Sequence, residues 1–106
     1  MKINILGTEY DFDGSEARKD VKLTNYDGYT DFYTKTIRYE TNHNRNDPNS
    51  IGDFDVWTAQ TKRHEIIHAF LFESGLSDYA ENELVVDWIA IQFPKMLEAF
   101  KRADCI

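Results

Sequence analysis

Two histidines four residues apart, with a glutamate directly after the first, are the clearest chemical signal in this chain. His64, Glu65 and His68 form the pattern H-E-x-x-H inside an apolar stretch that favours a helix. Residues four apart share one face of a helix, so both imidazoles can reach a single metal ion. The pattern predicts a Zn²⁺ site with Glu65 beside it as general base. The weaker alternative is a buried helix with two hydrogen-bonded core histidines.

A catalytic zinc ion usually has three protein ligands and one open position, so a third ligand must come from elsewhere. Glu83 and Asp87 are also four residues apart, which predicts that they share one face of a second helix. Glu83 would be the third ligand, and Asp87 would accept a hydrogen bond from a metal-bound histidine. The alternative is that both acids simply face solvent. Weaker candidate ligands are His43, Asp78 and Glu81.

The two motifs together resemble those of the gluzincin metallopeptidases, the class that includes thermolysin. The second motif reads N-E-x-x-x-D over residues 82–87 and follows the first after a short interval. The resemblance implies zinc-dependent hydrolysis of peptide bonds. The roles it implies are zinc ligation by His64, His68 and Glu83, general base catalysis by Glu65, and support of a ligand histidine by Asp87.

A narrower resemblance points to small proteins of phages and prophages. Ala90 extends the second motif to a pattern similar to that of the ImmA/IrrE-type peptidases, for which the implied target is a repressor or another regulator. Residues 63–76 look still closer to small proteins of phages and prophages in Gram-positive bacteria. Only 14 residues separate His68 from Glu83, which suits a minimal zincin. We therefore expect one zincin-like domain over residues 1–106.

A peptidase of this kind also needs a group that stabilises the oxyanion and a surface that holds the substrate chain. Zincins commonly hold the substrate against an edge strand, and by resemblance the strand at 36–40 would be that edge. The candidate residues for oxyanion or substrate contact are Tyr39, His43, Arg63 and Tyr79.

Two further functional classes compete with a zinc metallopeptidase that acts on a protein or peptide. One is a non-catalytic, zinc-stabilised binding module, such as a phage protein that docks on a host protein. Structural zinc sites usually have four ligands rich in cysteine, and the single cysteine, Cys105, is next to the C-terminus. The other is a metal-free interaction domain, which would make both motifs coincidental.

The composition excludes several other functions. A net charge of −7 argues against binding to nucleic acid and to anionic membrane surfaces. No apolar run approaches the roughly 20 residues that a membrane-spanning helix needs. A lone cysteine permits no internal disulfide, and we expect a cytoplasmic protein.

The elements that position these residues are predicted from residue patterns. Polar and apolar residues alternate through the first forty residues, which predicts a small antiparallel β-sheet. Asp53 fits the N-cap, and Gly75 the end, of the helix that carries H-E-x-x-H. A second helix, opening at Ser77 and ended or kinked by Pro94, is apolar on most sides and is predicted to be largely buried or to face a partner. The fold class is therefore α+β. Expected segments are strands at 2–6, 9–13, 21–23, 29–33 and 36–40, a polar loop at 41–52, and a last helical piece at 95–102.

Overall fold

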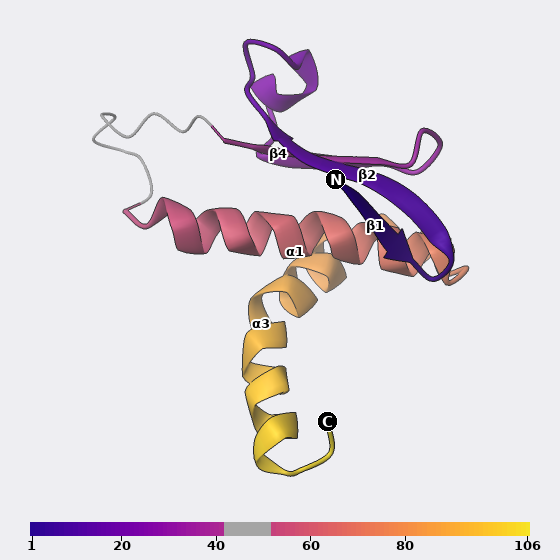
Figure 1. Ribbon diagram of the computed structural model, residues 1–106, viewed down its shortest axis with the longest axis vertical. Coiled ribbons are helices and arrows are strands. Elements are labelled where there is room, and N and C mark those ends of the chain that lie inside the picture. Colours follow the sequence, from indigo (N-terminus) through magenta and orange to yellow (C-terminus); the bar gives the residue numbers. More distant parts are fainter. Residues whose placement is uncertain (42–51) are drawn as a thin grey trace.

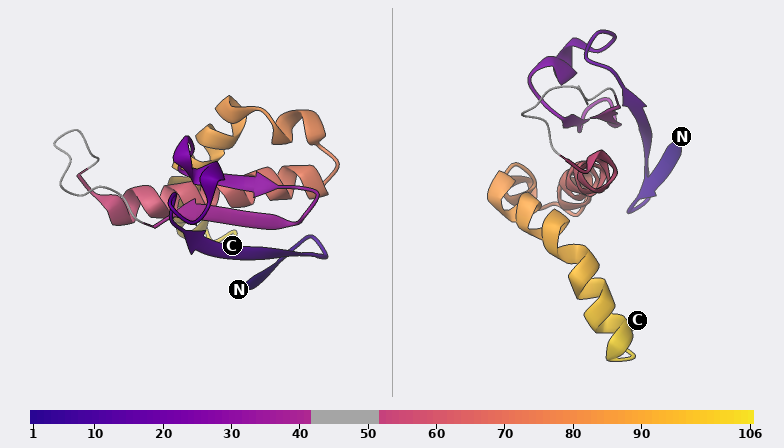
Figure 2. Two further views of the ribbon diagram at one scale, coloured as in Figure 1. Left: turned by 90° about the horizontal axis from the view of Figure 1, so that it is seen from above. Right: turned by 90° about the vertical axis from the view of Figure 1, so that its left-hand side faces the viewer.

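The computed structural model describes residues 1–41 and 52–106 and confirms the α+β class (Figure 1). A four-stranded N-terminal sheet lies along one side of a long helix, and a second long helix leaves from the other side (Figures 1 and 2). The strands are β1 (Lys2–Ile5), β2 (Thr8–Ser15), β3 (Gly28–Asp31) and β4 (Thr36–Glu40). The helices are α1 (Phe54–Glu73), α2 (Ser77–Ala80) and α3 (Glu83–Arg102).

The sheet is mixed, whereas the sequence pattern predicted a purely antiparallel one. Its strand order is β1-β2-β4-β3, and β2 pairs with β4 in parallel while the other two pairs are antiparallel. The predicted strand at 21–23 is a 3₁₀ turn, Val21–Thr24, because Asp20 caps it by accepting from the Lys22 amide. The connection between β2 and β3 positions the β3–β4 hairpin so that β4 lies next to β2 in the sheet. The expected edge strand β4 is therefore internal, and β3 is an edge strand of the sheet.

The face of the sheet that meets α1 carries the main core. Near the end of α1, the Glu73 carboxylate accepts hydrogen bonds from the Tyr10 hydroxyl at 2.8 Å and the Lys35 ammonium at 2.7 Å. These bonds fix α1 to β2 and to the β3–β4 turn. The buried apolar cluster consists of Ile5, Tyr10, Phe12, Ile37 and Ala69.

Both ends of α1 lie where the sequence predicts them. The Asp53 side chain accepts from the Val56 amide at 3.1 Å and caps the N-terminus. At the other end Gly75 has φ +85°, a left-handed conformation that glycine adopts without steric cost. Its N–H donates to the Phe72 carbonyl, and the Leu76 N–H donates to Leu71, which forms a Schellman motif. The chain therefore reverses direction directly after α1.

The predicted second helix is divided into two. The side chain of Asn82 accepts from the Val85 amide at 3.2 Å, so a new helix begins after it. This break places Glu83 in the first turn of α3, where the helix dipole favours an acid. Pro94 does not end α3, which continues to Arg102.

The second long helix is largely exposed, so the first of its two predicted environments, burial in the core, is wrong. Only Val86 and Ala90 are buried in α3, while Leu84 is 81% and Trp88 57% exposed. A single neighbouring helix can cover only one face of α3, and the C-terminal half extends away from the body (Figures 1 and 2). Within the described residues, no helix combines the length and the apolar character needed to cross a membrane.

Candidate metal centre

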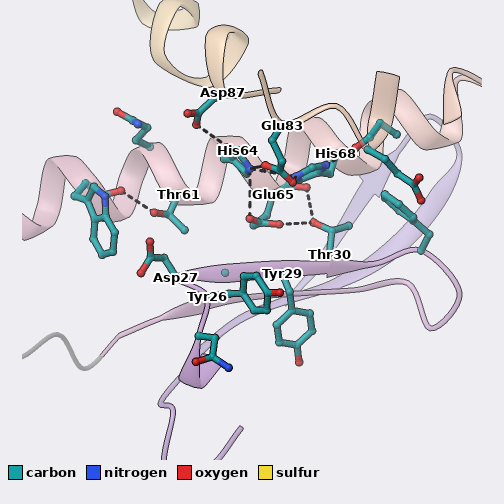
Figure 3. A pocket seen from close by; sticks show the side chains of 17 residues that line it. Tyr26, Asp27, Tyr29, Thr30, Thr61, His64, Glu65, His68, Glu83 and Asp87 are labelled. Carbon is teal, nitrogen blue, oxygen red and sulfur yellow. Dashed lines mark hydrogen bonds and ion pairs between the residues drawn. The ribbon is translucent and has the colours of Figure 1, made fainter. Parts of the chain in front are cut away.

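Three side chains from α1 and α3 converge on one point (Figure 3). His64 and His68 lie one turn apart on α1, with their Nε2 atoms 3.1 Å from each other. The Glu83 carboxylate reaches both rings, with one oxygen 2.8 Å from Nε2 of His64 and the other 3.2 Å from Nε2 of His68. The structure therefore brings together the three ligands that the sequence predicts.

The spacing of these donor atoms fits a zinc ion. Two ligands bound at about 2.05 Å in a tetrahedral site are separated by about 3.3 Å. The closest separations here are 2.8, 3.1 and 3.2 Å, which are near that value, and the Glu83 carboxylate meets the two rings through different oxygens. Two imidazoles and one carboxylate form the donor set of many catalytic zinc sites, and they leave the fourth position open.

Hydrogen bonds on the far side of each ring orient both histidines. Nδ1 of His64 lies 3.0 Å from the Asp87 carboxylate, and Nδ1 of His68 contacts the Ala80 backbone carbonyl. A carbonyl only accepts, so the proton of His68 is on Nδ1, and an ionised Asp87 has the same effect on His64. Both Nε2 atoms consequently present lone pairs to the centre. Asp87 thus has the position expected of a residue that supports a ligand histidine.

Glu65 lies beside the ligands but on the buried side of α1. One of its carboxylate oxygens is 4.0 Å from Nε2 of His64, and the residue is only 6% exposed. Burial raises the pKa of Glu65 above its usual value, while a hydrogen bond from Thr30 acts in the opposite direction. A carboxyl group with a raised pKa is better suited to accept and pass on a proton near neutral pH.

The edge strand β3 contacts Glu65 through Thr30, and the sequence pattern did not predict this contact. The Thr30 hydroxyl lies 2.8 Å from the Glu65 carbonyl oxygen and 3.0 Å from its carboxylate. A Cβ on Gly28 would lie 3.0 Å from Cγ of Glu65 and 3.1 Å from Cγ2 of Thr61, so glycine allows β3 to approach α1 closely. An Asp27-Gly28 pair marks a turn in the sequence, but nothing distinguishes Thr30 from other strand threonines.

A cavity of about 690 Å³ adjoins the cluster and is bounded by α1, the start of α3, and β3 with the segment before it (Figure 3). Its acidic lining comes from Glu83 of the cluster and from four further carboxylates, which are Asp27, Glu65, Glu81 and Asp87. Its aromatic lining comes from Tyr26, Tyr29, Phe32 and Trp57. The size and concave form suit a peptide segment.

Three predicted site residues that the structure describes, Tyr39, Arg63 and Tyr79, do not line the cavity. Nε of Arg63 donates to the Ala90 carbonyl at 2.8 Å and thereby fastens α1 to α3. The Tyr39 ring packs on Phe12, and Tyr79 is 54% exposed outside the cavity lining. Of the weaker candidate ligands, Glu81 lines the cavity and Asp78 does not. His43 and the polar loop around it lie outside the described residues.

Comparison of the chain with protein-family models, with curated proteins and with solved structures gives no match.

Proposed function

We propose that this protein is a zinc-dependent metallopeptidase that hydrolyses peptide bonds in a protein or peptide substrate. The observation that carries the proposal is the convergence of His64, His68 and Glu83 with a buried glutamate directly beside them. The sequence resemblance to gluzincins agrees with the same assignment of roles.

Each residue has a task in this reaction. A zinc ion at the cluster would lower the pKa of a bound water to near 7 and polarise the substrate carbonyl. Glu65 accepts the proton of the attacking water and then donates it to the leaving amine, so the amine departs neutral. Thr30 holds the Glu65 carboxylate, and Asp87 holds the ring of His64. The open side of the cluster faces the cavity, where a substrate carbonyl can approach.

A catalytic site is favoured over a structural one by the number of ligands. Structural zinc sites are generally closed by four protein ligands. The described residues provide three such ligands. The carboxylate of Glu65 lies beside them, but it is buried and does not belong to the cluster. The exposed apolar residues of α3 favour a binding role as a second candidate function, which is the zinc-stabilised module considered above.

The compartment belongs to the same proposal. Cys105 is the only cysteine of the chain and is an exposed free thiol. A chain with no disulfide needs no oxidising environment for its stability. We propose that the protein acts in the cytoplasm.

The test begins with zinc content per chain, measured by elemental analysis on protein purified without a histidine tag or chelator. We expect about one zinc per chain in the wild type, as the three-ligand site requires. Glu83→Ala should lose most of the zinc. Glu98→Ala, which changes an exposed acid further along α3, is the matched control and should keep it. Full zinc content in Glu83→Ala would exclude Glu83 as a ligand.

Catalysis is then tested on a diverse peptide mixture by mass spectrometry. The wild type should cleave peptides, and Glu65→Gln should retain zinc while kcat falls by about 10²-fold or more. Undiminished cleavage by Glu65→Gln would exclude Glu65 as the base. If the zinc-loaded wild type cleaved nothing while zinc stabilised its fold, the binding-module alternative would replace the peptidase.

A further inference from the structure

The groove beside the metal centre continues along the edge strand β3. A smaller hollow of about 390 Å³ shares Tyr26, Thr30, Phe32 and Glu81 with the main cavity, so the two form one depression. It extends from Asp27, which precedes β3, to Phe32, which follows it. Glu65 contacts Thr30 in the middle of this strand. A peptide bound in the groove would therefore pass Glu65, and its residues before and after that point would both lie in the groove.

The pairing of β3 determines which backbone groups face this groove. The Glu40 amide donates to the Asp27 carbonyl, so these two residues form a hydrogen-bonded pair. Hydrogen-bonded and non-hydrogen-bonded pairs alternate along antiparallel strands, so Tyr29 and Asp31 also direct their backbone groups towards β4. The N–H and C=O groups of Gly28 and Thr30 consequently point to the outer edge. In the described part of the chain no strand pairs with that edge. An extended peptide can add there as a further strand.

The groove has a strongly one-sided charge. Five carboxylates line the main cavity, and among the described residues no lysine or arginine does so. The combined negative charge of these carboxylates would exceed the two positive charges of a bound zinc ion. Lys22 lines the smaller hollow, but its ammonium is 3.7 Å from the Asp31 carboxylate. The lining therefore attracts cationic groups and repels anionic ones.

Two of these acids, Asp27 and Glu81, have no role in the proposed metal centre. Asp27 lies beside Thr61 at the start of the strand (Figure 3), and Trp57 lines the same cavity one turn earlier on α1. Glu81 lines both hollows together with Phe32. A carboxylate near an aromatic ring suits a lysine or arginine side chain, through an ion pair and a cation–π contact.

From these observations we infer that the groove selects extended peptides with basic side chains on either side of the reacting bond, and that Asp27 and Glu81 determine this selectivity. The inference rests on the proposed function because it names the substrate class of that site. The acids act on substrate binding, so their predicted effect is on KM and affinity.

Binding is measured with zinc-loaded Glu65→Gln, which holds substrate without cleaving it. Three labelled peptides of equal length differ only in the two residues that flank the centre, which are lysine, glutamine or glutamate. We expect the lysine peptide to bind about tenfold more tightly than the glutamine peptide at low salt. The glutamate peptide should bind most weakly, and the differences should shrink at high salt because exposed charges are screened.

Variants in the same background assign the effect to residues. Asp27→Asn and Glu81→Gln, made singly and together, should weaken the lysine peptide and leave the glutamine peptide unchanged. Glu98→Gln is the control of equal charge change and should alter neither. Equal affinity for all three peptides, or an unchanged preference in the double variant, would overturn the inference.

The two proposals fail in different ways. Cleavage of peptides by the wild type without regard to their charge would leave the peptidase intact and overturn the substrate class. Charge-selective binding by Glu65→Gln, without cleavage of the same peptides by the wild type, would support the basic-peptide groove and contradict the peptidase proposal.

Discussion

Asp87 on α3 holds the His64 ring on α1, with its carboxylate 3.0 Å from Nδ1. The helix that carries Glu83, the proposed third ligand, therefore also sets the orientation of His64. Because this contact crosses between two helices, the geometry of the centre depends on how α3 docks on α1.

Replacing Asp87 by alanine should lower zinc affinity by about 10- to 100-fold, because the ring of His64 loses its orienting acceptor. Competition with a chromophoric chelator measures this change. Asp87→Asn keeps an oxygen acceptor, so its zinc affinity should fall less than that of Asp87→Ala. An affinity equal to that of the wild type in Asp87→Ala would show that the contact does not orient the ligand.

Thr30→Val should lower kcat about tenfold while zinc content is unchanged, because one hydrogen bond to the Glu65 carboxylate is lost. Thr30→Ser keeps the hydroxyl and should restore most of the rate. Steady-state kinetics on a cleaved peptide separate kcat from KM. If valine and serine gave the same kcat, the hydroxyl would have no part in positioning Glu65.

The contacts of Glu73 predict how the stability of the metal-free protein depends on pH. Its hydrogen bond from Lys35, followed by that from Tyr10, keeps the pKa of Glu73 below its usual value. A carboxyl group with a lower pKa in the folded state stabilises the fold at pH above its unfolded-state pKa. That contribution is lost as the pH falls through the folded-state value.

Glu73→Gln should therefore be less stable than the wild type at pH 7, and the difference should narrow towards pH 3. Urea unfolding of both proteins at the two pH values measures it. The control is Glu98→Gln, in which the change is on the exposed part of α3. A difference that did not narrow at acid pH would mean that the charge of Glu73 is not the cause.

Gly75→Ala should destabilise the fold by about 1 kcal/mol, because φ of +85° is unfavourable for any residue with a Cβ. No atom lies within 4 Å of the position where that Cβ would be, so the cost comes from the backbone alone. Gly52→Ala is the matched control, since its site is equally open and its φ is not in the left-handed region. Equal thermal midpoints for the two variants would contradict this account.

The sequence predicted the parts of the site that depend on local spacing. The ends of α1 follow from Asp53 and Gly75, which act on their own helix ends. The shared face of His64 and His68 follows from helix geometry alone. The prediction for Glu83 used both the second motif and the tight turn at Gly75, and the structure brings its carboxylate next to His64 and His68.

The remaining features depend on contacts between distant segments. The parallel pairing of β2 with β4 is set by the path of the connection between β2 and β3, which alternation in the strands does not encode. Asparagine favours the N-cap of a helix, so Asn82 is a local sequence signal for the break before α3. The exposure of α3 could not be predicted, because apolar residues on several sides of a helix do not reveal how many neighbours cover it.

Glu83 belongs both to the first turn of α3 and to the cluster on α1, so a zinc ion bound there would link ion binding to the docking of α3. Linkage is reciprocal, and whatever holds α3 in place would then strengthen zinc binding by the same factor by which zinc strengthens the docking. Only Val86 and Ala90 of α3 are buried, so apolar packing covers little of this helix. A molecule that binds the exposed C-terminal half of α3 would then alter the occupancy of a metal site that it never touches.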